Sequence, residues 1–329
     1  MKIAVVGCGA VGSYYGALLS RAGEEVHFLL RTGYEVVSKQ GVEIVSGDRS
    51  FAVNPHCARN PDQIGWCDLV LIALKTTANR EFGRLISPLV GPHTALLTLQ
   101  NGLGNEEQLA ELFGSERVLG GLCFVCLERI EAGKILHTAH GNIYLGEYQR
   151  PPSARTRRVA DCFRRAGVSI TIADRLDFAR WEKLVWNIPF NGLSVASAAG
   201  WGSLIAGAWD RGQRFDCLST KQLLDDTRWT EAVRELTREV IAIANGLGLE
   251  LDLNLVDAQI ARTREMGSYR PSTLIDFELG RELELTSLFE SPLLEGRQLG
   301  IPTPWLERLC GVLRDLTDQD KVNVGQTIS

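Results

Sequence analysis

Short apolar runs, separated by helical or polar segments, fill the first half of the chain. Residues 69–74 form one such run, which is apolar without alternation and therefore typical of a strand covered on both faces. The alternation of strand-like runs with helical segments along the chain predicts a largely parallel sheet. The last runs of this half are separated by regularly spaced glycines and predict an antiparallel portion of the sheet. The predicted strands are 3–6, 25–30, 69–74, 94–99, 118–127, 134–138, 142–146 and 168–172.

Beyond residue 173 the apolar positions follow the periodicity of helices, and no segment has a convincing strand pattern. The chain is therefore predicted to be an α/β protein with two domains. A sheet domain covers residues 1–172, and an all-helical domain covers residues 173–329. The predicted helices are 175–200, 221–247, 253–267, 272–290 and 304–316.

A glycine-rich turn follows the first strand and leads into an apolar helix. It reads Gly7-Cys8-Gly9-Ala10-Val11-Gly12. In a Rossmann-type dinucleotide-binding domain the first glycine permits the turn, the second lets a pyrophosphate approach the backbone, and the third allows close helix–strand packing. The N–H groups at the helix start bind phosphate in such a fold. These six residues are candidate cofactor ligands, and the alternative is a purely structural turn.

The second predicted strand is followed by Arg31, at the point where NAD-specific sites carry an acidic residue. An arginine can pair with a 2′-phosphate in a fork geometry. Glu24 and Glu25 lie at the start of the strand, too early to bind the ribose. The sequence therefore favours NADPH over NADH.

Polar residues also follow two later strands, at Lys75 and at Asn101. Ligands of open α/β sheets bind at the carboxyl ends of the strands. We therefore expect Lys75 and Asn101 near the phosphate and nicotinamide ends of the cofactor. The alternatives are a solvated loop lysine and a plain Asn-Gly turn.

A polar stripe interrupts the most apolar segment of the helical domain. Lys183, Asn187 and Asn191 are spaced four apart and therefore share one face of a helix, among apolar and aromatic neighbours. Buried polar groups need partners, so this stripe indicates a lined cavity, the alternative being an ordinary surface stripe. Pro189 should kink the helix.

Composition and charge exclude several classes of protein. Hydrophobic residues make up 45% of the 329 residues and charged residues 23%, and the formal net charge of −5 argues against nonspecific binding to nucleic acid or anionic membrane. No apolar run could span a bilayer, and the N-terminus does not resemble a signal peptide, so a cytoplasmic location is expected. Cys123 and Cys126 lie on a predicted strand with their side chains on opposite faces, so no metal site is expected.

Together these residues resemble the ketopantoate reductases (2-dehydropantoate 2-reductases) over nearly the whole chain. The resemblance implies NADPH-dependent reduction of ketopantoate, a small 2-keto acid, to pantoate on the way to pantothenate. A homodimer is one expected assembly, although the sequence does not determine it. The matching features are the glycine turn, Arg31, Lys75, the turn Gln100-Asn101-Gly102-Leu103-Gly104, and the stripe Lys183, Asn187 and Asn191.

The resemblance also assigns roles that the residues alone do not. By themselves, Ser272 or Thr273 would be a helix N-cap, and Glu284 a surface residue. By resemblance, Lys183 is the catalytic acid, Glu284 assists it, and both contact the substrate. The further substrate ligands that it implies are Asn101, Asn187, Asn191 and Ser272.

Two departures from the family pattern concern the substrate side of the protein. The residues around Glu284 differ, and the segment 201–228 is lengthened. A reductase of another branched or aromatic 2-keto acid is therefore one alternative. A second alternative is a regulator that binds NADP(H) without turnover.

Overall fold

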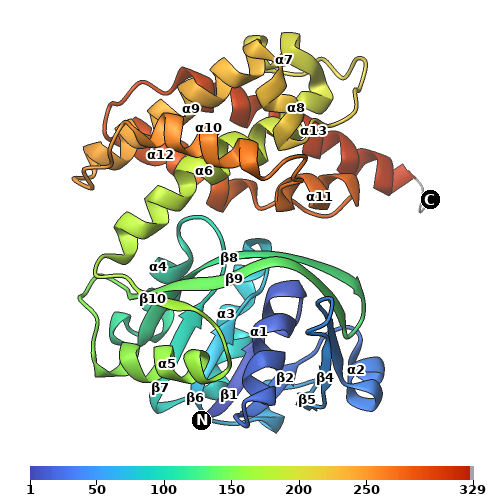
Figure 1. The fold of residues 1–329 in the computed structure, drawn as a ribbon, viewed down its shortest axis with the longest axis vertical. Helices are drawn as coiled ribbons and strands as arrows, with labels where there is room; N and C mark the ends of the chain where they lie inside the picture. The colour runs from blue at the N-terminus through green and yellow to red at the C-terminus, as the bar shows by residue number, and fades with distance from the viewer. Residues whose placement is uncertain (327–329) are drawn as a thin grey trace. The chain divides into compact units, whose positions relative to one another are not determined.

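The computed structural model describes residues 1–326, with side chains up to residue 318. It divides into two compact units, Met1–Ala179 and Arg180–Ser329. The division falls within helix α6 (Leu176–Ala196), seven residues beyond the boundary expected from the sequence. The first unit contains the sheet, and the described part of the second contains helices without strands (Figure 1).

The sheet of the first unit has ten strands in the order β4-β3-β9-β8-β7-β6-β1-β2-β5, with β10 beside β9. Neighbouring strands from β8 through β5 run parallel, whereas β8 and β9 are antiparallel, as the sequence predicted. The strands are β1 (Lys2–Val6), β2 (Glu25–Leu29), β3 (Val42–Val45), β4 (Phe51–Val53), β5 (His56–Ala58), β6 (Cys67–Ile72), β7 (Val90–Thr98), β8 (Val118–Glu131), β9 (Lys134–Glu147) and β10 (Ile170–Ile172).

Both faces of the central strands are buried, which explains their unbroken apolar sequences. In β6, Leu69 and Leu71 join one core cluster, whereas Val70 and Ile72 join the other. This division confirms the prediction of a strand covered on both sides. The helices of this unit are α1 (Ala10–Arg21), α2 (Tyr34–Gln40), α3 (Phe82–Ile86), α4 (Asn105–Phe113) and α5 (Ala154–Arg165).

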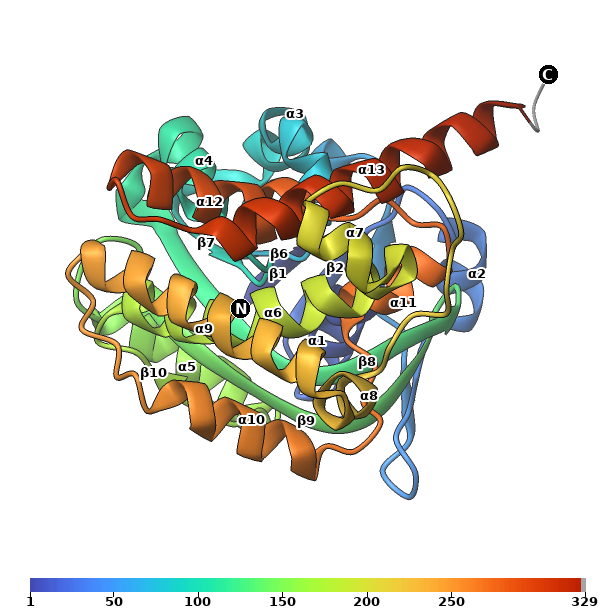
Figure 2. The same ribbon diagram turned by 90° about the horizontal axis from the view of Figure 1, so that it is seen from above.

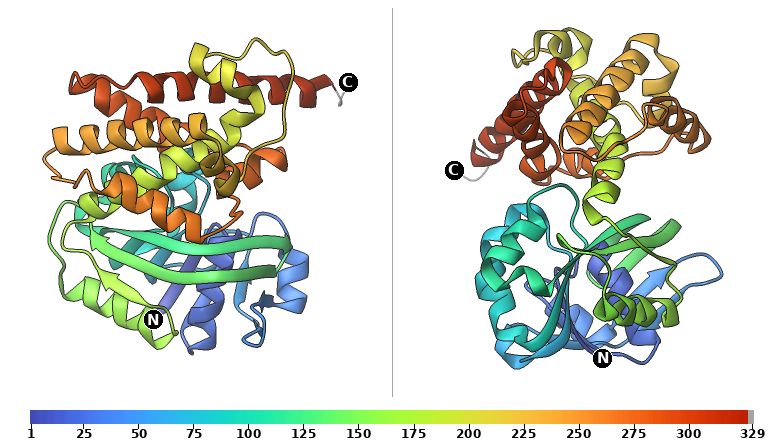
Figure 3. Two further views of the ribbon diagram at one scale, coloured as in Figure 1. Left: turned by 45° about the horizontal axis from the view of Figure 1, so that its top comes forward. Right: turned by 90° about the vertical axis from the view of Figure 1, so that its left-hand side faces the viewer.

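The β8–β9 hairpin departs from the sequence prediction. The two strands expected at 134–138 and 142–146 form the single strand β9, because Gly141 (φ +131°) is accommodated as a bulge opposite Phe124 and Val125. The hairpin curves across the unit and ends beside α2 (Figure 3, left). There β9 pairs with β3, one of three short strands, β3 to β5, that the sequence pattern did not reveal.

Helix α6 passes through the middle of the second unit (Figure 2). Gly192 allows close contact with α13, since a Cβ there would lie 2.5 Å from Leu309, and Trp186 donates to Thr263 of α10 at 2.9 Å. The other helices of this unit are α7 (Gly200–Ala206), α8 (Thr220–Asp225), α9 (Thr227–Gly246), α10 (Leu255–Glu265), α11 (Ser272–Glu278), α12 (Ser291–Gln298) and α13 (Pro304–Gln326), with a π-helix η6 (Thr286–Glu290).

Two long helices predicted in the second unit are wrong as single elements. The helix expected at 221–247 is broken between α8 and α9, where the Asp226 side chain accepts N–H bonds from Arg228 and Trp229 and caps α9. The helix expected at 272–290 ends at Glu278 and resumes only before η6. In both cases apolar periodicity continues across a break that capping and tertiary packing impose.

Among the described residues no helix combines the length and apolarity needed to cross a membrane. Within the same residues no cluster of three or more metal-ligating side chains occurs. Cys123 and Cys126 both lie in β8 as thiols.

Candidate cofactor and active site

Five parallel strands of the first unit end at one edge of the sheet. Val6 of β1 is in register with Leu29 of β2 and Ile72 of β6, and these strands are flanked by β5 and β7 in matching register. The segments that follow the strand ends therefore share this edge, which the sequence analysis had expected for four of the five. They begin at Gly7, Leu30, Arg59, Ala73 and Leu99.

The three glycines of the turn after β1 have different surroundings. Gly7 has φ +100°, and a Cβ there would lie 2.3 Å from the backbone nitrogen of Leu74. At Gly12 a Cβ would lie 2.2 Å from the carbonyl oxygen of Gly7, so this glycine lets α1 pack closely on the turn. A Cβ at Gly9 would meet no atom within 4 Å. The backbone at Gly9 is therefore open to a ligand, while Gly7 and Gly12 serve the fold.

The N–H groups of the first turn of α1, at Ala10 and Val11, have no intrahelical acceptors. The N-cap residue is Gly9, which has no side chain to accept a hydrogen bond from them. Such a terminus attracts phosphate. The Cys8 thiol points the other way, toward the carbonyl oxygens of Val5 (3.5 Å) and Leu29 (3.6 Å), and burial raises its pKa. Cys8 therefore offers its backbone to this site.

Arg31 lies two residues beyond the end of β2 and is exposed. Among the residues with described side chains, it has no ion pair or hydrogen bond partner. Arg59, which follows β5 at the same edge, stacks over the Tyr34 ring at 4.3 Å and pairs with Glu35. Arg59 was not among the residues expected at this edge, because β5 is only three residues long and has no recognisable strand pattern.

Lys75 and Asn101 follow β6 and β7 at this edge. Lys75 is exposed and N-caps the short helix Thr76–Glu81. The loop at Asn101 is held by a chain of amides, in which Gln100 donates to Asn79 at 2.8 Å and Asn79 to Asn105 at 2.9 Å. Asn105 in turn donates to the Asn101 carbonyl at 3.0 Å. This network holds the Asn101 backbone and makes the loop more than a plain turn.

The predicted polar stripe lies on α6, entirely within the second unit from Lys183 onward. Its three members lie on one helix, as the spacing predicted. Lys183 is half-buried, while Asn187 and Asn191 are 7% and 3% exposed. Among the described residues Asn187 has no hydrogen-bond partner. The amide atoms of Asn187 are not among the side-chain atoms that are buried without a partner, so they stay accessible and can donate to and accept from a ligand.

Asn191 connects α6 to the start of α11. Its Oδ1 atom accepts the backbone N–H of Thr273 at 3.1 Å in a buried position. The expectation that Ser272 or Thr273 caps this helix is wrong, since the N-cap residue is Pro271, whose side chain makes no capping hydrogen bond. Asn191 supplies the missing acceptor from another helix. Ser272, which opens α11, is thereby brought beside the stripe with its side chain exposed.

Glu284 is 9% exposed and lies in the non-helical segment before η6. Its carbonyl oxygen accepts the N–H of Leu288 at 3.2 Å, so it starts the next helical turn. The expectation of a plain surface residue is therefore wrong. The π-helix that follows is a feature common near functional sites.

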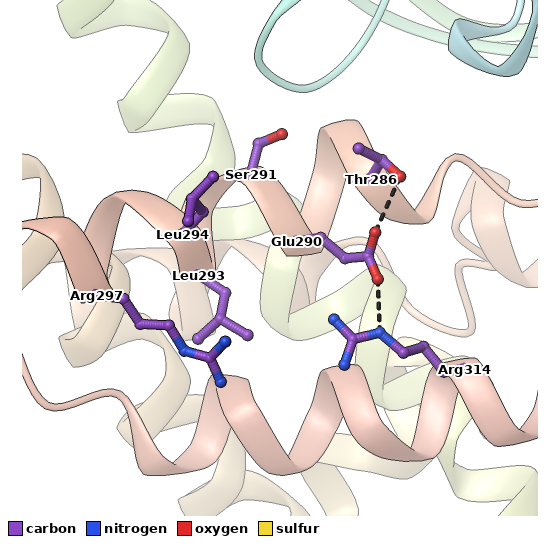
Figure 4. A pocket seen from close by; sticks show the side chains of 7 residues that line it. All are labelled: Thr286, Glu290, Ser291, Leu293, Leu294, Arg297 and Arg314. Atoms are coloured by element: carbon purple, nitrogen blue, oxygen red, sulfur yellow. Dashed lines mark hydrogen bonds and ion pairs between the residues drawn. The ribbon is translucent and has the colours of Figure 1, made fainter.

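A separate cavity of about 320 Å³ in the second unit contains none of the predicted site residues. Glu290 accepts hydrogen bonds from Thr286 at 2.9 Å and Arg314 at 2.6 Å, and Arg297 pairs with Glu307 at 3.1 Å. Both arginines are thus compensated, which leaves no free charge for an anionic substrate. The lining residues are Thr286, Glu290, Ser291, Leu293, Leu294, Arg297 and Arg314 (Figure 4).

A glycine turn of the dinucleotide-binding type at a parallel sheet edge, together with a lysine on a polar stripe of a helical unit, is typical of a dinucleotide-dependent oxidoreductase. Two family models match the chain. "Ketopantoate reductase PanE/ApbA" covers residues 3–150, and "Ketopantoate reductase PanE/ApbA C terminal" covers residues 215–317. The chain belongs to the ketopantoate reductase family.

Individual relatives are similar along almost the full length of the chain. A 2-dehydropantoate 2-reductase of Nostoc sp. is 36% identical over 326 residues, covering 97% of this chain and 96% of the relative. The crystal structure of a 2-dehydropantoate 2-reductase from Geobacter metallireducens has a TM-score of 0.86 and 43% identity, covering 97% and 99% of the two chains. A D-mandelate dehydrogenase with NADH and anilino(oxo)acetate reaches a TM-score of 0.85 at 18% identity, which shows a common fold alone.

Proposed function

We propose that this protein reduces 2-dehydropantoate (ketopantoate) to pantoate with NADPH, a step of pantothenate biosynthesis. The observation that carries the proposal is the stripe on α6. There the half-buried Lys183 shares one helix face with Asn187, a largely buried residue whose amide makes no hydrogen bond to the described residues. Family membership supports the reaction. A cytoplasmic location belongs to this proposal, and a homodimer is the expected assembly, which light scattering tests.

The residues of the sheet edge fit the cofactor. The open backbone at Gly9 and the N-terminus of α1 suit a pyrophosphate. The exposed Arg31 suits the 2′-phosphate that distinguishes NADPH from NADH. Lys75 and Asn101, which extend from the same edge, are proposed as further cofactor ligands.

Bound NADPH supplies the hydride for the 2-keto carbon, and the protein manages the charge that develops on the carbonyl oxygen. We assign that task to Lys183, whose ammonium group stabilises the alkoxide and donates the proton that completes the alcohol. Glu284 is assigned to orient the lysine or the substrate hydroxyl. Its low exposure keeps this carboxylate away from bulk solvent and strengthens such an interaction.

The remaining substrate ligands offer hydrogen bonds without charge. Asn187 has both amide atoms available, whereas Asn191 has its oxygen committed to Thr273 and can offer only its NH2 group. Ser272 can contribute its exposed hydroxyl. These groups suit the carboxylate and the terminal hydroxyl of ketopantoate. Asn101 is proposed as a further substrate ligand.

The proposal is tested by NADPH oxidation with a panel of 2-keto acids. We expect a higher kcat/KM for ketopantoate than for 2-ketoisovalerate or pyruvate, which lack its terminal hydroxyl. A site built to pair that hydroxyl rejects analogues without it by a large factor. If 2-ketoisovalerate is reduced equally well, the substrate assignment is wrong although the reductase class remains.

A further inference from the structure

The far end of the β8–β9 hairpin is attached to the segment that follows β2. Glu43 and Ile44 of β3 pair with Lys134 and Ile135 of β9, and Lys134 Nζ lies 3.2 Å from the Glu43 carboxylate. The N–H of Glu43 donates to the carbonyl of Gly133 at 2.7 Å. These contacts hold the hairpin end beside α2 (Figure 3, left).

This attachment brings Arg129 of β8 to the carboxyl end of β2, about a hundred residues earlier in the chain. A guanidinium nitrogen of Arg129, Nη2, lies 3.7 Å from the position that a Cβ would take at Gly33. Ala132 contacts the same glycine, with its Cβ 2.9 Å from that position. The Arg129 charge is also close enough to Cys8 to act on its thiol, opposing the effect of burial. Arg129 therefore adjoins the turn that contains Arg31.

Neither arginine is neutralised by the side chains that the structure describes. Among the residues with described side chains, Arg31 and Arg129 have no ion pair and no hydrogen-bond partner, although Arg129 is half-buried. Arg59 at the same edge is different, because Glu35 compensates its charge. Two uncompensated cations close to one turn repel each other unless an anion binds there. A partly buried cation also loses hydration, which increases the benefit of an anionic partner.

We propose that Arg129 is a second cation for the 2′-phosphate of NADPH, acting together with Arg31 beside the turn after β2. The inference rests on the proposed function for its cofactor and adds a residue that no local motif reveals. Two guanidinium groups match a phosphate dianion, whereas the plain ribose hydroxyls of NADH need no such charge. Arg129 thus sets cofactor specificity and takes no part in the chemical step.

The test compares two ligands that differ only in the 2′-phosphate, 2′,5′-ADP and 5′-AMP, by calorimetric titration of the full-length protein. We expect the wild type to bind 2′,5′-ADP more tightly. Arg129→Met should lower that affinity about 10- to 150-fold, the range of a charged hydrogen bond, and leave 5′-AMP affinity within about twofold. The dependence of 2′,5′-ADP affinity on salt should become shallower.

Lys134→Met is the matched control, since it removes one positive charge from the same hairpin, while the backbone pairing of β9 with β3 that positions the hairpin end remains. It should leave the ratio of the two affinities unchanged. If Arg129→Met also keeps the wild-type ratio while Arg31→Met loses it, the role of Arg129 is refuted and the NADPH proposal stands. If the wild type binds both ligands equally, the cofactor assignment itself is wrong.

Discussion

Alanine at Gly9 and alanine at Gly12 form a matched pair of substitutions in the turn after β1. At Gly12 the new Cβ would lie 2.2 Å from the Gly7 carbonyl oxygen, whereas ordinary contact begins at 3.4 Å. The start of α1 must therefore move by about 1 Å, and overpacking of this kind costs about 1–3 kcal/mol of folding free energy. At Gly9 the Cβ meets no atom within 4 Å, and the φ of −76° is accessible to alanine.

The two variants should therefore separate folding from cofactor binding. Gly9→Ala should change the free energy of unfolding by less than about 1 kcal/mol. Its methyl group would occupy the space through which a pyrophosphate approaches the backbone. Loss of one charged hydrogen bond, worth about 1.5–3 kcal/mol, corresponds to a 10- to 150-fold weaker affinity for NADPH.

Thermal unfolding followed by circular dichroism, combined with NADPH titration by fluorescence, measures both quantities. Gly12→Ala should lower Tm, and Gly9→Ala should keep Tm while it weakens NADPH binding. Wild-type affinity in a folded Gly9→Ala variant would refute the assignment of this turn to the cofactor. Wild-type stability of Gly12→Ala would refute the packing argument.

Three further predictions concern the helical unit. Lys183→Ala should lower kcat by about 10²–10⁴-fold with NADPH affinity unchanged, and near-full turnover of this variant would contradict the mechanism. The Lys183→Ala/Glu284→Ala double variant should lose less in the free energy of kcat/KM than the sum of the two single losses. Asn191→Ala leaves the buried Thr273 N–H without an acceptor and should cost about 1–3 kcal/mol in urea unfolding, while Asn191→Asp, which keeps an acceptor, should cost less. Burial raises the pKa of Glu239 from 4.5 to about 7, although the backbone N–H groups from which it accepts hydrogen bonds at the start of α13 oppose this shift. Between pH 4.5 and 7 the folded chain therefore binds more protons than the unfolded chain. The free energy of unfolding should fall by about 3 kcal/mol over this range as the pH rises. The Glu239→Gln variant should lack that slope, and an equal slope in both proteins would exclude Glu239 as its source.

The features that depend on local periodicity could be predicted from the amino-acid sequence. The strand, glycine turn and helix from Lys2 to Arg21 follow from apolar alternation and from glycine spacing. The common face of Lys183, Asn187 and Asn191 follows from a spacing of four residues, since each helical turn repeats after 3.6 residues. The shared edge of the parallel strands was also expected, because such strands must all point in one direction.

Tertiary structure alone decided which distant segments meet. Arg129 reaches the turn after β2 only because β9 pairs with β3, and no pattern near residue 129 contains that pairing. Likewise, the start of α11 is capped by Asn191 from another helix, although Ser272 or Thr273 was the cap expected from the sequence. The physical reason is that periodicity reports which face of an element is buried and does not report what covers it. Contacts between elements depend on strand register and helix packing, which involve residues far apart along the chain.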